Sequence, residues 1–377
     1  MSERAADFAI VGGGAIGCGI AHALALEGAR VVVLERSRVA AEASGAAAGI
    51  LAPRVHATAP GMFELAMASH RLFPELTNAL KEETQLDPEY VRSGVLDLAH
   101  DEDDERALRA KVADQVRNGH AVQWLDAAEV HAREPALARD TRGAYFDADA
   151  YHIHPARFTQ ALAQAAARRG ARVRVGVEAH GIRRTGSRAI AVRTNDGDVA
   201  ADHVILASGA WMAACGDWID VHVPVYPARG QILTVCAVPP PIRCVVFGAD
   251  AYLLPRVDGT VVVGATVERA GFDKSLTAGG LGWLFGVLDK LCPALSAAPF
   301  DRAWAGLRPG SPDELPIVGM APGWDNVTIA TGHFRNGIML TPITARLVAR
   351  HLLHGVEDPL LAPLSPQRFN PSDPIKR

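Results

Sequence analysis

The feature that most constrains this chain is a glycine-rich turn between two short apolar runs near its start. The segment DFAIVGGGAIGCGIAHALALEGARVVVLER predicts a strand over residues 8–11, a helix over 15–27 and a second strand over 31–34. A strand, a glycine turn, a helix and a further strand in this order are typical of a dinucleotide-binding unit.

The glycines of this turn satisfy G-x-G-x-x-G at Gly12, Gly14 and Gly17. The first permits a tight turn, the second lets backbone approach a pyrophosphate, and the third lets helix and strand pack closely. The phosphates would then lie at the positive end of the helix. Glu35 ends the second strand, where a carboxylate can bind ribose hydroxyls.

The stretch that follows favours FAD over NAD as the nucleotide. ASGAAAGILAP, residues 43–53, is dense in small residues, which lets a large flat ring lie against backbone. The alternative is an alanine-rich helix, but Gly45, Gly49 and Pro53 argue against a long one. The sequence has neither a second glycine motif of this kind nor a redox C-x-x-x-x-C.

Composition excludes several other classes of protein. The 377 residues carry a net charge of −4 with both signs mixed and no basic block, which counts against nucleic-acid binding. Five scattered cysteines without C-x-x-C predict reduced thiols and a cytoplasmic location, and no zinc site. We expect no signal peptide and no membrane span.

The remaining chain predicts an α/β fold with two interleaved parts. Helical spacing over residues 64–83 is interrupted at Pro74, DEDDER begins a helix, and Pro155 and Gly170 bound another. A strand ends before SGAW and should return to the nucleotide-binding sheet. Consecutive strands over 221–266, with a two-residue turn at Asp258-Gly259, predict a mixed or antiparallel sheet. We expect a last strand at 326–330 and a last helix at 341–354.

These elements predict an FAD-binding, glutathione-reductase-like Rossmann domain interleaved with an α+β substrate domain. The FAD-binding domain is predicted from residues 1–90, 146–220 and 306–377, and the substrate domain from 91–145 and 221–305.

The order of several motifs resembles one flavoprotein family. GGGAIG, ASGAAAGILAP, ASGAW, VYPARGQ, AYLLPR, VVVGAT, WAGLRPGSPDELPIVG and ATGHFRNGI are similar to the D-amino-acid oxidase-like FAD-dependent oxidoreductases, and within them to the glycine oxidases of bacterial thiamine biosynthesis. The likeness spans nearly the whole chain and is weakest over residues 94–145. It implies oxidation of a small amino acid to its imine, with oxygen reduced to hydrogen peroxide, in a homotetramer.

The resemblance also implies which residues form the site. Arg308 would hold the substrate carboxylate, Tyr252 would add a phenol, and Arg335 would lie beside flavin and substrate. We further expect Pro309 and Gly310 to form a turn after Arg308, with Gly306 letting backbone pass close to a ring. The residues expected at the FAD are Gly12, Gly14, Ala15, Ile16, Gly17, Glu35, Arg36, Ala43, Ser44, Ala48, Gly49, Ile50, Val177, His333, Phe334, Arg335, Asn336, Gly337, Ile338 and Met339.

Two positions depart from the pattern of the glycine oxidases. Asp250 stands where they carry histidine, and Val267 where they carry methionine, which leaves the preferred substrate open among glycine, sarcosine and D-amino acids. Residues 315–319 contain no cysteine, so we expect non-covalent FAD. His152 and His154 alternate like strand positions, and we expect them to be structural rather than metal ligands.

Three other functions remain open from the sequence. A D-amino-acid or D-hydroxyproline dehydrogenase would pass electrons to an acceptor other than oxygen. A related flavin domain acting on modified tRNA is opposed by the net charge of −4. The third is a non-catalytic flavin-binding subunit of a larger complex.

Overall fold

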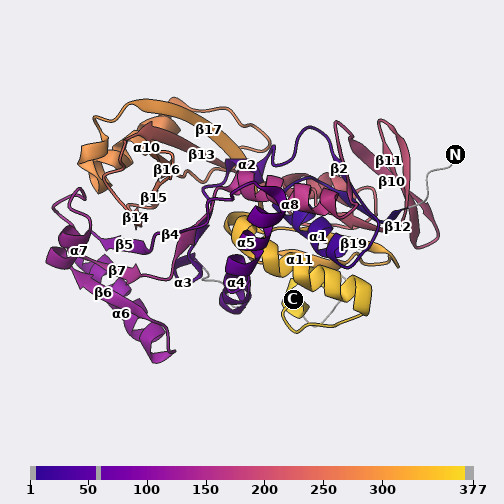
Figure 1. Ribbon diagram of the computed structural model, residues 1–377, viewed down its shortest axis with the longest axis horizontal. Coiled ribbons are helices and arrows are strands. Elements are labelled where there is room, and N and C mark those ends of the chain that lie inside the picture. The colour runs from indigo at the N-terminus through magenta and orange to yellow at the C-terminus, as the bar shows by residue number, and fades with distance from the viewer. Residues whose placement is uncertain (1–5, 57–60, 370–377) are drawn as a thin grey trace.

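Two large sheets organise the chain, which is described by a computed structural model over residues 6–56 and 61–369. Each sheet has eight strands and dominates one lobe of the molecule, and a small three-stranded sheet lies between the lobes (Figure 1). The small sheet consists of β3 (Ile50–Leu51), β8 (Tyr151–His152) and β4 (Val91–Arg92). The α/β class predicted from the sequence is confirmed.

The first sheet is the nucleotide-binding sheet predicted from the glycine turn. Its parallel strands are, in spatial order, β9 (Arg172–Val175), β2 (Val31–Glu35), β1 (Ala6–Val11), β12 (Gly197–Leu206) and β19 (Val327–Thr331). The strand before SGAW, β12, does return beside β1, as predicted. Antiparallel strands complete the sheet: β18 (Ile317–Met320), β10 (Ala179–Thr185) and β11 (Arg188–Thr194).

Helices cover one face of this sheet and bury its apolar side chains. They are α1 (Ala15–Leu26), α4 (Met62–His70), α5 (Phe73–Thr84), α8 (Pro155–Arg168) and α11 (Gly337–His354). The predicted interruption at Pro74 is confirmed, because α4 ends at His70 and Pro74 lies in the first turn of α5. On α8, Phe158 and Leu162 are fully buried in the core with α1.

The second sheet is mixed, as predicted. Its order is β17 (Phe300–Gly310), β13 (Tyr226–Cys236), β16 (Thr260–Gly264), β15 (Ala251–Pro255), β14 (Val245–Gly248), β5 (Val95–Ala99), β7 (Gly143–Asp147) and β6 (Val122–Asp126). Only the β14–β5 pair is parallel among these described strands. Helices α6 (Glu102–Arg117), α7 (Ala127–Arg133) and α10 (Ala278–Leu291) belong to this lobe (Figure 1).

Two local predictions in this lobe differ in outcome. The acidic run does begin α6, where the Asp101 carboxylate caps the helix by accepting from the N–H groups of Asp103 and Asp104. The turn between β15 and β16 is longer than predicted. The Arg256 N–H donates to the Thr260 carbonyl at 2.8 Å, so the turn comprises residues 257–259 rather than two residues.

The expected turn at Pro309-Gly310 is wrong. The strand β17 continues to Gly310, and Pro309 faces Pro227 of β13. Proline has no N–H to donate, so two facing prolines fit a non-hydrogen-bonded pair of an antiparallel ladder. Because β17 is an edge strand, the other side of Pro309 needs no partner strand.

The end of the chain also differs from the sequence prediction. The last helix, α11, begins at Gly337 rather than at residue 341, and it tolerates Pro342 near its start. The strand β18 was not predicted. Within the described residues, no helix is both long and apolar enough to cross a membrane.

Short helices connect these elements near the centre of the molecule. They are α2 (Ala43–Ala46), α3 (Pro53–His56) and α9 (Met212–Gly216). The small-residue stretch therefore contains one helical turn followed by β3, in keeping with the expectation that no long helix forms there.

Candidate functional site

A cavity of about 1350 Å³ lies between the two large sheets and takes in residues from both. It exceeds the roughly 300–1,000 Å³ of ordinary small-molecule sites, as a dinucleotide together with a substrate requires. Most of the residues expected at the FAD or the substrate line it. They are Gly12, Gly14, Ala15, Ile16, Glu35, Arg36, Ala43, Ser44, Ala48, Gly49, Ile50, Val177, Tyr252, Arg308 and every residue from His333 to Met339. Gly17 does not line the cavity.

The glycine turn presents the N-terminus of α1 to this cavity. Gly12 has a φ of +115°, and a Cβ built there would lie 2.4 Å from the Ala207 carbonyl oxygen. Gly14 is the N-cap residue, without a side-chain cap, and the first turn of α1 contains no acidic residue. The positive dipole end of α1 therefore faces the cavity, as a phosphate site needs.

Gly17 lies in α1 against the glycine turn, outside the cavity lining. A Cβ on Gly17 would lie 2.0 Å from the Gly12 carbonyl oxygen, a separation that real Cβ atoms do not adopt. Gly17 thus lets α1 pack against the turn, which is the role that the motif assigns to its third glycine.

Glu35 closes the turn at the carboxyl end of β2. The side chain is nearly buried, and its carboxylate accepts hydrogen bonds from the Gly13 N–H at 2.8 Å and the Ser37 N–H at 2.9 Å. It therefore fixes the glycine turn and at the same time lines the cavity.

Arg36 is held by two residues that were not predicted from the sequence. Its guanidinium lies 4.0 Å from the ring centroid of Trp211 and pairs with Glu42 at 3.1 Å. Both partners line the cavity. Trp211 belongs to the ASGAW motif, which was a signal for it, whereas nothing in the local sequence marked Glu42.

The small-residue stretch is fastened to the second sheet by side chains that bind its carbonyl groups. Trp304 Nε1 donates to the Ala46 carbonyl at 3.0 Å, and the Arg256 guanidinium donates to the Ala48 carbonyl. Ser44 Oγ accepts the first helical N–H of α1 at 2.9 Å. Burial lowers the pKa of Arg256 to about 10, which leaves it charged at neutral pH. The two lobes thus meet at this stretch.

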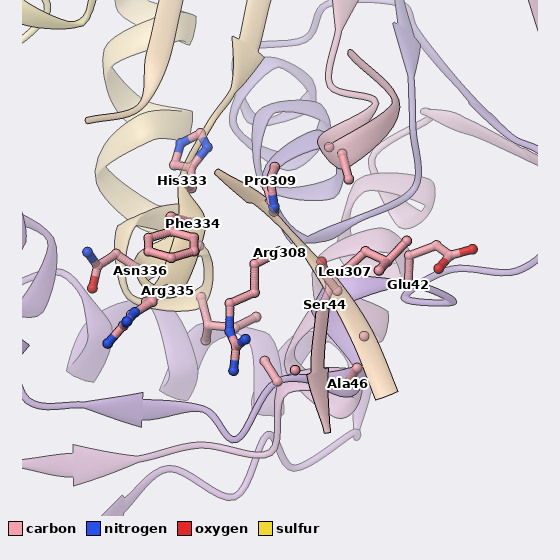
Figure 2. A pocket seen from close by; sticks show the side chains of 18 of the residues that line it. Glu42, Ser44, Ala46, Leu307, Arg308, Pro309, His333, Phe334, Arg335 and Asn336 are labelled. Carbon is pink, nitrogen blue, oxygen red and sulfur yellow. The ribbon is translucent and has the colours of Figure 1, made fainter. Parts of the chain in front are cut away.

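Arg308 projects from β17 into the cavity, near the residues that lead into α11 (Figure 2). Its guanidinium lies across Gly230 of β13, where a Cβ would come within 2.3 Å of Nη1, and Nη1 donates to the Thr266 carbonyl at 3.1 Å. Among the residues that the structure describes, no carboxylate forms an ion pair with Arg308. Burial lowers the pKa of this guanidinium, Tyr252 opposes that shift, and Arg335 adds to it. Such a group is poised to bind an anion.

Gly306 lines the cavity and also lies against the small-residue stretch. A Cβ on Gly306 would lie 2.5 Å from Cβ of Ala46, so this glycine lets β17 pass close to the small-residue stretch.

Tyr252 lies on the neighbouring part of the sheet, across Gly264. The two residues are paired between β15 and β16, and a Cβ on Gly264 would lie 2.3 Å from the phenol oxygen. Burial raises the pKa of Tyr252 to about 12, although Arg308 and Arg256 oppose the shift. The phenol is therefore protonated at neutral pH and able to donate a hydrogen bond.

The N-terminus of α11 forms another wall. Arg335 and Asn336 lie in the turn before the helix, and no side chain caps the helix start (Figure 2). Burial lowers the pKa of His333 to about 3, so its ring is neutral, and its Nε2 lies 3.1 Å from Thr344 Oγ1. The uncapped helix end offers N–H groups and a positive dipole to negative charge in the cavity.

Both departures from the glycine oxidase pattern lie in the cavity lining. Asp250 is exposed in the turn between β14 and β15, and Val267 is 50% exposed. Asp97 of β5 also lines the cavity and pairs with Lys111 at 3.6 Å. It comes from the stretch where the resemblance is weakest, and no motif marked it.

One of the five cysteines lines the cavity, and His152 does not. All five cysteines are free. Among the described residues, Cys215 is the only cysteine in the cavity lining, and burial raises its pKa to about 11. His152 is buried, and the structure contains no cluster suited to a metal ion within its described ranges.

The N-terminus of α1 on a largely parallel sheet, facing a cavity of dinucleotide size, defines a dinucleotide-binding α/β protein. Residues 7–351 match the FAD dependent oxidoreductase family DAO, and the chain belongs to that family. It is therefore an FAD-dependent oxidoreductase.

Three comparisons show how similar the chain is to known proteins. The chain is 35% identical to the bifunctional protein ThiO/ThiG of Trichormus variabilis, covering 96% of this chain and 55% of that protein. It is 35% identical to a glycine oxidase of Geobacillus kaustophilus, covering 91% of this chain and 92% of that one. A crystal structure of glycine oxidase from the same organism superposes with a TM-score of 0.93 at 34% identity, covering 97% and 99% of the two chains. The chain spans about half the length of the bifunctional relative.

Proposed function

We propose that this chain oxidises glycine or another small amine or amino acid, such as sarcosine, D-alanine or D-proline, to its imine. Molecular oxygen would be the final acceptor and hydrogen peroxide the product, with a role in thiamine biosynthesis. The observation that carries this proposal is Arg308, a charged guanidinium that faces the cavity and lacks a carboxylate partner within the described chain. The named glycine oxidases among the relatives support it.

The residues of the cavity fit an FAD molecule. The N-terminus of α1, whose turn cannot hold a Cβ at Gly12, suits the pyrophosphate, and Glu35 suits the ribose. Residues 43–50 and 333–339 would lie along the flavin, and Val177 would lie at the adenine end. The bound FAD would supply the acceptor for the hydride that leaves the substrate Cα.

The protein's own task in this reaction is orientation. Arg308 would bind the substrate carboxylate through two N–H groups, while Nη1 also donates to the Thr266 carbonyl. The protonated Tyr252 phenol would donate a further hydrogen bond, and Arg335 would lie beside the substrate. Two fixed contacts on the carboxylate set the direction of the Cα–H bond, as catalysis by positioning requires.

The N-terminus of α11 would stabilise negative charge. Its first turn carries no acidic side chain, and its N–H groups lack a side-chain cap. A helix N-terminus placed where charge develops lowers the energy of the charged state without reorganisation. The neutral ring of His333 adds no positive charge there.

The decisive experiment measures hydrogen peroxide from the purified FAD-loaded protein with glycine, sarcosine, D-alanine and D-proline under air. We expect peroxide with at least one of them. A parallel anaerobic assay follows bleaching of the flavin and reduction of an artificial dye. Bleaching and dye reduction without peroxide would establish a dehydrogenase instead, and no bleaching with any of the four would refute the proposal.

Several finer properties belong to the same proposal. The FAD is bound non-covalently, because residues 315–319 contain no cysteine and burial keeps the Cys215 thiol protonated. Acid precipitation should therefore release the yellow colour into the supernatant, and colour in the pellet would contradict this. A cytoplasmic homotetramer stays a prediction of the cysteine pattern and the resemblance. The domain division also stays a prediction, and its outermost segments extend beyond the described residues.

A further inference from the structure

The carbonyl that holds Arg308 belongs to a segment with little regular structure. Residues 265–277 connect β16 to α10, and within this described segment the only strand-like pairing is a single bridge between Glu268 and Arg229 of β13. In that bridge, each residue donates its N–H to the carbonyl of the other at 2.9 Å. Thr266, Val267 and Glu268 line the cavity. The Thr266 N–H also donates to the Gln231 carbonyl at 3.2 Å. The segment therefore has few backbone hydrogen bonds to β13, and side-chain contacts add to them.

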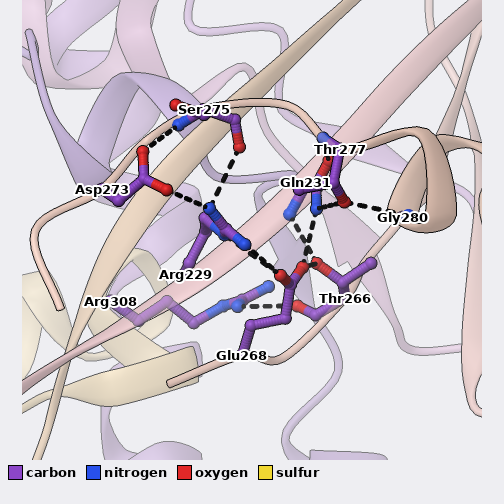
Figure 3. Close-up of polar contacts among 9 residues, drawn as sticks. All are labelled: Arg229, Gln231, Thr266, Glu268, Asp273, Ser275, Thr277, Gly280 and Arg308. Carbon is purple, nitrogen blue, oxygen red and sulfur yellow. Dashed lines mark hydrogen bonds and ion pairs between the residues drawn. The ribbon is translucent and has the colours of Figure 1, made fainter. Parts of the chain in front are cut away.

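The Glu268 side chain adds such contacts (Figure 3). One carboxylate oxygen accepts from Arg229 Nε at 3.1 Å and also from Arg229 Nη2. The other accepts from Gln231 Nε2 at 2.8 Å and from the Thr266 hydroxyl. Burial raises the pKa of this carboxyl, but the hydrogen bonds from Thr266, Arg229 and Gln231 outweigh burial and hold the pKa below its usual range. Glu268 is thus anionic at neutral pH.

Thr266 links this carboxylate to Arg308. Its hydroxyl donates to Glu268 and accepts the Gln231 N–H at 2.9 Å, and its carbonyl accepts Nη1 of Arg308 at 3.1 Å. A displacement of Glu268 would therefore be transmitted through one residue to the guanidinium. Figure 3 shows Thr266 in contact with both Glu268 and Arg308.

Arg229 pairs with the Glu268 carboxylate and lies outside the cavity lining. It is only 6% exposed, and it also donates to Asp273 at 2.9 Å and to the Ser275 carbonyl at 3.2 Å. It does not line the cavity, whereas Glu268 and Arg308 both do. Without Arg229, an anionic side chain in the same cavity would be free to pair with Arg308 in competition with a substrate carboxylate.

We propose that Glu268 is a positioning residue for carboxylate binding: it fixes Arg308 through Thr266, and Arg229 keeps its charge from pairing with Arg308. This inference rests on the proposed function, because it requires Arg308 to bind the substrate carboxylate. Nothing in the sequence motifs marked Glu268, which follows the departure at Val267.

The test measures acetate affinity of the FAD-loaded protein by titration of the flavin absorbance, together with KM and kcat for the best amine substrate. The variants are Glu268→Gln, Arg229→Met, the double variant and Arg308→Ala. Asp273→Asn is the matched control, because it also removes a carboxylate from Arg229 but lies outside the cavity with its side chain 53% exposed.

We expect Glu268→Gln to weaken acetate binding and raise KM by about three- to ten-fold, the effect of one lost orienting hydrogen bond. Asp273→Asn should change the acetate affinity and KM less than two-fold, as expected for an exposed ion pair. Arg229→Met should weaken acetate binding most of the three, and adding Glu268→Gln to it should restore part of the affinity. A purely structural role for the network predicts no such restoration.

Equal effects of Glu268→Gln and Asp273→Asn would overturn the inference, and so would a double variant that binds acetate no better than Arg229→Met. If Arg229→Met does not fold, the comparison of Glu268→Gln with Asp273→Asn decides alone. Arg308→Ala tests carboxylate binding by Arg308 separately from the positioning role of Glu268. Unchanged acetate binding in that variant would refute the carboxylate site itself, whatever Glu268 does.

Discussion

At the scale of single residues, the substrate end of the cavity depends on side chains that lie flat on neighbouring glycines. Arg308 lies across Gly230 and Tyr252 across Gly264, and in both cases a Cβ would come within 2.3 Å of a polar atom of the side chain. Each pair therefore fixes a polar group against backbone rather than against another side chain. Gly230, in the motif VYPARGQ, is therefore part of the site together with Arg308.

Replacing Arg308 by alanine tests the anion site directly. Loss of a charge-assisted hydrogen bond of about 1.5–3 kcal/mol should raise KM about ten- to a hundred-fold, while the protein stays yellow. The control is Arg302→Ala on the same strand, whose side chain is 71% exposed, pairs with Asp301 and lies over the Trp304 ring. Steady-state kinetics measure KM, and the flavin spectrum measures the FAD content. An unchanged KM would count against Arg308 as the ligand of the substrate carboxylate.

Gly230→Ala should act on the same guanidinium without touching its charge. The new Cβ would lie 2.3 Å from Nη1, so the Arg308 guanidinium must move away from its present position. We expect a raised KM with full FAD content. Gly279→Ala is the control, because no atom lies within 4 Å of a Cβ there. Equal kinetics of the two variants would show that the guanidinium does not depend on this surface.

At the scale of elements, the first strand, turn and helix act as one unit in which the third glycine never reaches the cavity. Gly17→Ala should nonetheless abolish FAD binding, because its Cβ would lie 2.0 Å from the Gly12 carbonyl oxygen and force the turn apart. Gly282→Ala, a helical position in α10 with open space around it, should bind FAD normally. The ratio of flavin to protein absorbance after purification measures the effect, and a yellow Gly17→Ala protein would contradict it.

The elements also show what local sequence determines and what it does not. Glycine spacing, Pro155 and the acidic run near Asp101 predicted their helices because caps and turns act over a few residues. The helix α10 was missed because AGGLGWLFGVLDKL is rich in glycine, a poor helix former. Its buried stripe of Leu284, Val287, Leu288 and Leu291 stabilises it by packing.

The residues of the site also divide into those that local sequence predicted and those that it did not. Cavity-lining residues that lie within motifs, such as Arg308, were predicted, whereas Glu42, Asp97 and Glu268 were not. These three reach the cavity through tertiary contacts: Glu42 with Arg36, Asp97 with Lys111, and Glu268 with Arg229. The turn expected at Pro309 failed for a related reason, since only the pairing with Pro227 shows that this segment is a strand.

At the scale of the whole molecule, buried histidines couple stability to pH. Burial lowers the pKa of His22 and His203 to about 4, and that of His152 and His333 to about 3, from an unfolded value of 6.5. The unfolded chain therefore binds more protons between these values. The stability that these groups contribute is fully present above about pH 6.5 and is lost as the pH falls towards 4.

Urea melts at fixed FAD concentration should accordingly show a falling free energy of unfolding from pH 7 to pH 4.5. Each group contributes at most about 1.4 kcal/mol per pH unit within its window. His203→Gln should flatten the slope, and the exposed His180→Gln should leave it unchanged. Identical slopes for the two variants would remove histidine burial as the cause.

The cavity wall begins at Val11 and ends at Met339, and the second sheet joins residues 95–147 to 226–310 through the parallel pair β5–β14. The cavity is therefore complete only after nearly all of these residues have been synthesised. A chain still on the ribosome lacks a wall of the cavity until α11 has emerged, so we expect FAD capture to follow the emergence of α11 and long-range pairing to govern its pace. Nascent chains arrested before Gly337 should not retain FAD, and retention by such chains would contradict this order of assembly.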